Sequence, residues 1–250
     1  MLIKTPQKID KIRKAGHLLA SIFDLLLPKV KAGMTTLEID KMFNEEIAKA
    51  GAVSSCIGFF EYPAATCISV NDQVTHGIPD DYVLKNGDIV DIDVVLDIDN
   101  AFADMSYTLK IGKVSDNANK LVKISKECLH KGIEQAKPGN KLNDIGIAIE
   151  RHAKENGFSV VREYVGHFIG DAIHEEPEVL NYYAKGNDLI LKEGMIFCIE
   201  PMINEGNWQV ITEGWDVRTK DHKLSSRFEH MILITKDGCE ILTPLKFDQK

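Results

Sequence analysis

Residues Leu84–Asp93 read LKNGDIVDID, and this stretch decides the fold because the chain repeats it. Residues Leu191–Glu200 read LKEGMIFCIE, which is identical at five of the ten positions at an offset of 107 residues. Each copy places a glycine turn before an apolar strand and ends on an acidic residue. One such match alone is explained equally well by a common local turn and by a true repeat.

A second match runs at nearly the same offset. Three features recur 106 residues later: Lys31–Gly33 as Lys137–Gly139, Glu38-Ile39 as Asp144-Ile145, and Gly51 as Gly157. A histidine in the frame His-x-x-Pro also precedes each repeated strand, at His76 and His174. Two matches favour an ancestral duplication. We therefore expect a single domain over residues 1–250 with halves of about 1–112 and 113–250, whose pseudo-twofold axis brings Asp93 and Glu200 to related positions.

Helix and strand patterns around the repeats predict a mixed α/β (α+β) fold. Apolar residues at helical spacing predict helices over about 6–28, 36–51, 117–137 and 142–156. Thr5-Pro6 and Thr35–Glu38 have the composition of helix amino-terminal caps. The β-branched residues and turn signals of segments 67–111 and 158–242 predict strands.

Composition and charge exclude several classes of protein. The chain has 250 residues, 44% of them hydrophobic, and a net charge of −8, which disfavours stable binding to nucleic acid or an anionic membrane. A metal ion or a peptide amino terminus suits that sign better. Five scattered cysteines without a CxxC pair predict free thiols in a reducing compartment. The apolar stretch Leu18–Leu27 is too short to span a bilayer, so we expect a cytoplasmic protein. Its expected partners are small cations and peptides.

The repeated strand continues into an acidic hairpin. Its strand, turn and return strand are expected over Ile89–Leu96, Asp97–Asn100 and Ala101–Ile111. If the turn is centred between Ile98 and Asp99, Asp93 lies opposite Asp104, with Cβ atoms about 4.5–5.5 Å apart. Two carboxylates that close repel each other unless a cation or a proton lies between them. The alternative is an exposed hairpin whose charges are screened by water.

Further acids and an imidazole lie in apolar or glycine-rich surroundings. Glu200 ends the apolar run 195–199, Glu229 leads into the apolar run 231–234, and His167 stands between Gly166 and Phe168. Acids in such strands are costly to bury without a partner. Oxygen ligands with one nitrogen suit manganese, iron, cobalt or zinc. Four carboxylates carry too much charge for one ion, so we expect two divalent ions.

The motifs together resemble the type I methionine aminopeptidase family over nearly the whole chain. The segments that carry the resemblance are Cys67–Asp72, His76–Pro79, Asp91–Val94, Tyr164–His167, His174–Pro177, Ile199–Met202 and Phe228–His230. They occur in order and with family-like spacing. The family fold, called pita-bread, is a pseudo-twofold antiparallel sheet with helices packed on its outer face, which agrees with the internal repeat.

The resemblance implies a dinuclear metal site and a peptidase mechanism. The implied ligands of the two ions (cobalt, manganese, iron or zinc) are Asp93, Asp104, His167, Glu200 and Glu229. Asp104 and Glu229 would bridge the ions. Glu200 would act as general base toward a water activated by both ions, while His174 and His76 would contact the scissile amide. The implied substrates are amino-terminal methionines of peptides and nascent proteins, with the ribosome as a candidate partner and a monomeric enzyme.

The substrate pocket departs from the family pattern. Its walls are expected at Phe59, Tyr62, Cys67 and Trp215, beside His76 and His174, although each wall residue could instead be plain core. Phe168 and Cys198 stand where glycine and threonine are common in the family, which leaves the substrate range open.

Three other interpretations stay open at this point. An X-Pro peptidase on the same fold would cleave before proline, a silent pita-bread protein would bind peptides or nucleic acid, and an auxiliary enzyme would have narrowed specificity. The ligand set admits several native metals.

Overall fold

The computed structural model describes residues 2–247. Its helices are α1 (Pro6–Leu26), η1 (Leu27–Lys29), α2 (Thr36–Lys49), η2 (Phe59–Glu61), α3 (Asp116–Ile133) and α4 (Leu142–Glu155). Its strands are β1 (Val53–Ser54), β2 (Cys67–Val70), β3 (Gln73–Thr75), β4 (Ile89–Ile98), β5 (Ala101–Lys110), β6 (Ser159–Val160), β7 (Gly166–Phe168), β8 (Glu175–Val179), β9 (Ile196–Ile199), β10 (Met202–Asn204), β11 (Val210–Glu213), β12 (Asp216–Thr219), β13 (Ser225–Arg227), β14 (His230–Ile234) and β15 (Cys239–Ile241). Within residues 2–247, no helix is long and apolar enough to cross a membrane.

Side-chain caps start the first two helices where the sequence predicts them. The Thr5 hydroxyl accepts the backbone N–H of Lys8 at 3.2 Å, with proline in the first turn of α1. At α2, Thr35 and Glu38 form a reciprocal capping box. The third helix is shorter than predicted: α3 ends at Ile133, and the segment up to residue 137 forms turns instead of a last helical turn.

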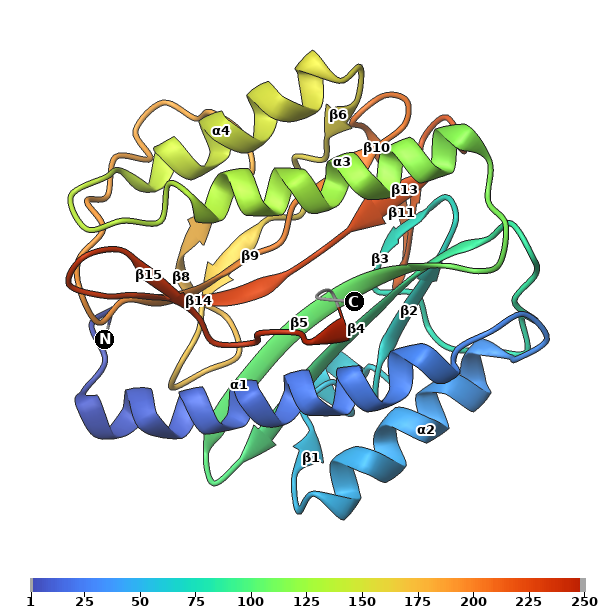
Figure 1. Cartoon of the computed structure of the whole chain (residues 1–250), viewed down its shortest axis with the longest axis horizontal. Helices are drawn as coiled ribbons and strands as arrows, with labels where there is room; N and C mark the ends of the chain where they lie inside the picture. Colours follow the sequence, from blue (N-terminus) through green and yellow to red (C-terminus); the bar gives the residue numbers. More distant parts are fainter. Residues whose placement is uncertain (1, 248–250) are drawn as a thin grey trace.

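The strands pair antiparallel in four sheets. The two largest are the β1-β4-β2 sheet with β5 added to β4, and the five-stranded sheet in the order β15-β14-β9-β7-β8. Figure 1 shows these strands between two helix pairs, with α1 and α2 along one side of the view and α3 and α4 along the other. The combination of antiparallel strands with helices packed outside them agrees with the predicted fold class.

The two halves share backbone conformation where the sequence repeats. Gly33 and Gly139 both lie in the left-handed region, at φ 91° and 92°. Their N–H groups donate to the carbonyls of Leu84 and Leu191, at 2.8 and 2.9 Å. Antiparallel bridges join the same segments, at Thr35–Val83 and at Lys141–Ile190. Each repeated turn is thereby fixed against the start of the helix that precedes it, and the strand ending on Asp93 or Glu200 follows directly.

The register of the acidic hairpin differs from the prediction. Asp93 pairs with Ser106, and Asp104 pairs with Val95. The turn consists of Asp99 and Asn100 alone, both in the left-handed region at φ 54° and 60°, which aspartate and asparagine tolerate. The turn is therefore one residue further along than expected. The two aspartates stay on one face but lie diagonally, where Cβ atoms are typically about 7–8 Å apart.

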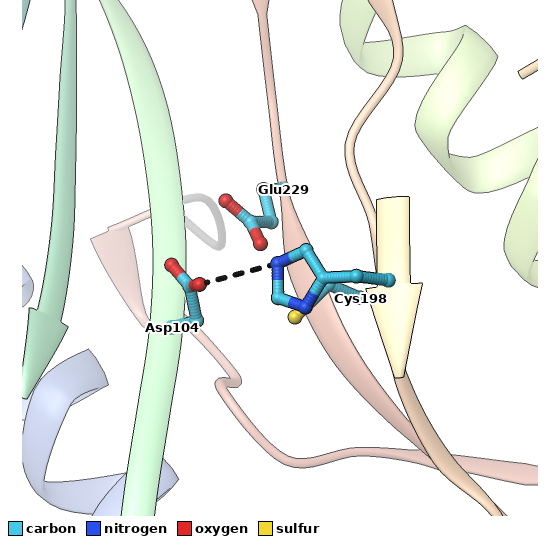
Figure 2. Close-up of side chains that lie close together, drawn as sticks. Asp104, Cys198 and Glu229 are labelled. Atoms are coloured by element: carbon cyan, nitrogen blue, oxygen red, sulfur yellow. Dashed lines mark ion pairs between the residues drawn. The ribbon is translucent and has the colours of Figure 1, made fainter. Parts of the chain in front are cut away.

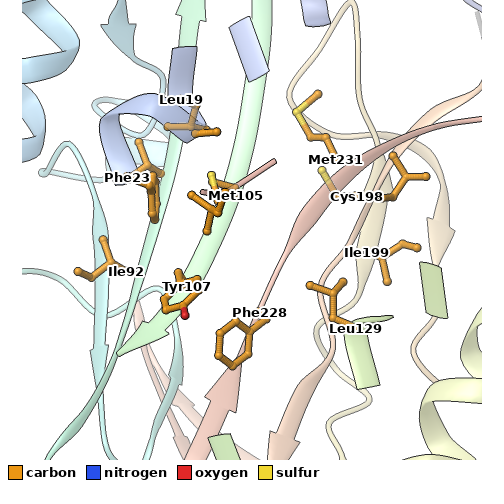
Figure 3. Packing of buried hydrophobic residues seen from close by; sticks show 14 of the residues in the cluster. Leu19, Phe23, Ile92, Met105, Tyr107, Leu129, Cys198, Ile199, Phe228 and Met231 are labelled. Atoms are coloured by element: carbon orange, nitrogen blue, oxygen red, sulfur yellow. The ribbon is translucent and has the colours of Figure 1, made fainter. Parts of the chain in front are cut away.

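The main hydrophobic core fills the space between helices and strands. Leu19 and Phe23 of α1 pack with Ile92 and Met105 of the hairpin, and all four side chains are buried (Figure 3). Leu129 of α3 belongs to the same cluster and lies near the strands of the second half. Because a packed core deforms little, the helices hold both large sheets in a fixed relation.

Candidate metal centre

All of the predicted site residues line one pocket of about 470 Å³. They are Phe59, Tyr62, Cys67, His76, Asp93, Asp104, His167, His174, Glu200, Trp215 and Glu229. These residues are distant in sequence and come from both halves of the chain.

The five acidic and imidazole side chains expected at the metal lie on strands or directly beside them. Asp93 is on β4, Asp104 on β5 and His167 on β7. Glu200 directly follows β9, and Glu229 stands in the break between β13 and β14. The N–H of Glu229 donates to the carbonyl of Ser106 at 3.1 Å, which ties this break to the hairpin. All five residues are at least nine-tenths buried.

The imidazole of His167 is oriented as a metal ligand would be. Its Nδ1 lies 3.1 Å from the carbonyl oxygen of Phe168 and donates to it. That bond fixes the tautomer and leaves the lone pair of Nε2 free. Nε2 faces two carboxylates, at 3.5 Å from Asp104 Oδ2 and 3.6 Å from Glu200 Oε1.

Four possible ligand atoms converge most tightly. One atom each of Asp104, His167, Cys198 and Glu229 lies within 4.8 Å of the others. Figure 2 shows Asp104, on β5, and Glu229, in the break between β13 and β14, projecting toward the same space, with Cys198 beside them. In the sequence, Cys198 stands out only as a departure from threonine. Its position within 4.8 Å of the proposed ligand atoms of Asp104 and Glu229 was not predicted.

Arg227 was missed by the sequence analysis. This arginine is only 2% exposed and lies against three carboxylates, at 2.7 Å from Asp93, 2.8 Å from Asp91 and 3.3 Å from Glu200. A signal was available, because Arg227 stands in a short strand just before Phe228 and Glu229, a position where a charge is not expected unless it is paired. Its guanidinium neutralises part of the negative charge of the site.

The remaining charge is still large for a buried site. Burial, reinforced by neighbouring carboxylates, raises the pKa of Asp104 to about 8. Burial also raises the pKa of Glu200 to about 7, and that of Glu229 well above its usual range. Among the described residues, Asp93 Oδ1 and Glu229 Oε1 are buried oxygens without a hydrogen-bond partner. Unpaired buried oxygens and a free imidazole nitrogen fit divalent cations well.

An apolar wall adjoins the acids. Cys56, Tyr62, Ala64, Cys67 and Val95 form a separate buried cluster, against which Trp215 packs. The Tyr62 and Trp215 rings meet edge to face, with centroids 5.1 Å apart. Tyr62 is fixed further because its hydroxyl donates to the carbonyl of Gly77 at 2.8 Å. Of the four residues predicted as walls, Tyr62, Cys67 and Trp215 belong to this cluster, and Phe59 lines the same pocket.

The two predicted catalytic histidines, His76 and His174, both line this pocket. The His76 ring contacts Tyr164 and Trp215, with centroids 5.4 and 5.6 Å away. Burial, together with the charge of Arg227, lowers the pKa of His76 to about 4, so this imidazole is neutral near pH 7. The His174 ring lies 4.2 Å from the His167 ring and 5.3 Å from Phe59.

The fold and the pocket together define a metal-dependent hydrolase of the pita-bread class. The chain belongs to metallopeptidase family M24, which it matches over residues 10–236. It is 46% identical over 250 residues to the methionine aminopeptidase of Escherichia coli K12, covering 98% of this chain and 95% of that protein.

Solved structures agree with this assignment. The methionine aminopeptidase of Rickettsia prowazekii is 42% identical and superposes with a TM-score of 0.95, over 98% of this chain and 100% of that one. The X-Pro aminopeptidase of Thermotoga maritima is 27% identical with a TM-score of 0.77, and the match covers 98% of this chain but 63% of that one. The family and the pita-bread fold predicted from the sequence are confirmed.

Proposed function

We propose that this chain removes the amino-terminal methionine from peptides and proteins, in a single catalytic domain built from two related halves. The observation that carries the proposal is the convergence of Asp93, Asp104, His167, Glu200 and Glu229 beside an apolar pocket. The proposal is supported by the similarity to methionine aminopeptidases, which covers nearly the full length of this chain and of each relative. The apolar wall suits an unbranched thioether side chain, because transfer of such a side chain from water to an apolar pocket lowers the free energy.

Two divalent ions are the cofactors we propose, with cobalt, manganese, iron and zinc as candidates. Asp104 and Glu229, which both belong to the group of ligand atoms within 4.8 Å of one another, would contact both ions, whereas Asp93 would serve one ion and His167 with Glu200 the other. Ions bound there would lower the pKa of a coordinated water and polarise the first carbonyl of the substrate. They would also bind the free amino group, which limits cleavage to the first residue.

The chain's own side chains supply proton transfer and hydrogen bonds. Glu200, which would also bind one ion, is proposed to accept the proton of the attacking water and release it to the departing nitrogen. His174 is proposed to donate to the oxyanion, and His76 to the scissile amide. Donors of this kind typically contribute about 10²–10³ in rate.

Nascent chains are the proposed physiological substrates, and we propose a monomer that works in the cytoplasm. The net charge of −8 supports a cationic amino terminus as partner and gives no support to a polyanion such as nucleic acid. Any contact with the ribosome would then depend on a local patch of the surface.

The decisive experiment compares substrates and metals in one series. Metal-free protein is reloaded singly with manganese, iron, cobalt or zinc and assayed on Met-Ala-Ser and on an Ala-Pro peptide. Release of methionine from the first with little cleavage of the second is expected. Preference for Ala-Pro would favour an X-Pro peptidase, and no cleavage with any metal would leave a silent binding protein.

Asp104→Asn is the matched variant for that series. Because the side chain would contact both ions, the variant should lose bound metal and activity together, as measured by elemental analysis and the same assay. Full turnover in a metal-poor Asp104→Asn protein would contradict the bridging role.

A further inference from the structure

An ion pair outside the metal centre joins the start of the chain to the segment that carries His174. The ammonium of Lys4 lies 2.9 and 2.6 Å from the two carboxylate oxygens of Glu175. The Lys4 side chain is only 2% exposed and that of Glu175 is 15% exposed. The two residues are 171 positions apart in the sequence.

Lys4 is itself fixed to the second half of the molecule. Its N–H donates to the carbonyl of Gly194 at 2.9 Å, and the preceding Ile3 forms an antiparallel bridge with Met195. The side chain then passes over Gly170, where a Cβ atom would lie 2.3 Å from Lys4 Cε. A side chain at position 170 would therefore force the Lys4 side chain to shift from this path.

The Glu175 carboxylate organises the segment between β7 and β8. Its Oε1 accepts the N–H groups of Asp171 at 2.6 Å and of Ala172 at 3.3 Å. Both residues are exposed, so little packing holds them. A carboxylate that accepts two backbone N–H groups and faces an ammonium fixes the path of the chain between them.

That path ends on His174, the residue directly before Glu175. The His174 ring is exposed to the pocket and stands edge to face against His167. A displacement of about 1 Å at a reacting centre can cost about 10²-fold in rate. The position of this ring therefore depends on the contacts that hold its segment, which are those of Glu175 and the packing of Ile173 against the cluster that contains Tyr62.

We propose that Lys4 is a positioning residue for His174, acting through the Glu175 carboxylate that holds residues 171–174. This inference rests on the role given to His174 under the proposed function. The contrasting explanation is a purely structural ion pair that adds stability and leaves the reaction untouched.

Two variants isolate the contact. Lys4→Met keeps the length of the side chain but removes the ammonium. Lys8→Met is the matched control, because Lys8 Nζ also approaches this segment, at 3.4 Å from the exposed Asp171 carboxylate, without reaching Glu175. Metal content and unfolding temperature are measured for both, so that loss of metal or of fold is recognised directly.

Amide hydrogen exchange tests the positioning without any chemistry. In Lys4→Met, exchange at the Asp171 and Ala172 amides should accelerate by about tenfold or more, since their acceptor is no longer held in place. Exchange in Lys8→Met should stay near that of the wild type. Unchanged exchange in Lys4→Met would overturn the proposal whether or not the protein is an aminopeptidase.

Steady-state kinetics on Met-Ala-Ser test the consequence. Lys4→Met should lower kcat by about tenfold with a smaller change in KM, part of the about 10²–10³ that loss of such a donor costs. In a His174→Ala background the same substitution should change kcat by less than about twofold, because its effect passes through the missing ring. If the reductions in kcat caused by Lys4→Met and by His174→Ala multiply in the double variant, the two substitutions act independently and the proposal is overturned. If His174→Ala alone leaves kcat unchanged, the proposed role of His174 is wrong and this inference fails with it. The exchange data would still show whether Lys4 protects the amides of Asp171 and Ala172.

Discussion

Replacing Arg227 by methionine should destabilise the metal-free protein far more than the metal-loaded protein. The guanidinium is the buried cation that Asp91, Asp93 and Glu200 share, with contacts of 2.7–3.3 Å. Removing one partner of a buried ion pair typically costs about 3–5 kcal/mol, because the remaining charge is left uncompensated. For a chain of 250 residues this corresponds to a fall of about 6–20 °C in Tm.

The control for this experiment is a surface arginine with similar contacts. Arg218 lies 2.6 Å from Asp72 and 2.7 Å from Asp216, but its side chain is 38% exposed. Water screens such a pair, so Arg218→Met should cost no more than about 1 kcal/mol.

Urea and thermal unfolding of both variants are compared with the wild type, first with chelator and then with excess manganese. Bound ions should restore much of the stability that Arg227→Met loses, since they supply positive charge to Asp93 and Glu200. The reasoning is refuted if, without metal, Arg227→Met is no less stable than Arg218→Met, or if metal makes no difference to the loss.

In metal-free protein, burial raises the pKa of Glu200 to about 7. The folded state therefore holds a proton on Glu200 that the unfolded chain releases near pH 4.5, so the urea midpoint of the metal-free protein should fall as pH rises from about 5 to about 7.5. With saturating manganese the midpoint should change little over this range. A midpoint that rises with pH in the absence of metal would contradict this reasoning. His76→Ala should reduce kcat by about 10²–10³ while metal content stays constant, and equal losses of both would contradict its assignment as a donor. Gly16→Ala should lower the free energy of unfolding by about 1–3 kcal/mol, measured in urea, because its Cβ would lie 2.3 Å from the carbonyl oxygen of Leu242.

Much of the fold was predictable because the repeat and the caps are local signals. The glycine of Lys31–Gly33 and its counterpart at Gly139 mark turns that must adopt a left-handed conformation. The capping box at Thr35 and Glu38 fixes where α2 begins. Such features depend on residues within a few positions of each other, so a single sequence contains them in full.

The features that the sequence analysis missed depend on side chains that meet across the chain. The hairpin register depends on which of two adjacent positions forms the turn, and the left-handed backbone at Asp99-Asn100 is compatible with the later one. The position of Arg227 indicates a paired charge, but its three carboxylate partners are distant in sequence and are identified only in space. The contact of Cys198 with the acids likewise follows from the convergence of strands from both halves.

The division of the acids between the halves also orders events during synthesis. Asp93 and Asp104 are translated before Glu229, which is held against the earlier hairpin through the carbonyl of Ser106. A cation therefore finds its complete set of donors only when the carboxyl-terminal strands have added to that hairpin. If the proposed ions bind there, their uptake follows the addition of these strands, and a chain that stops before Glu229 would lack one of the proposed ligands.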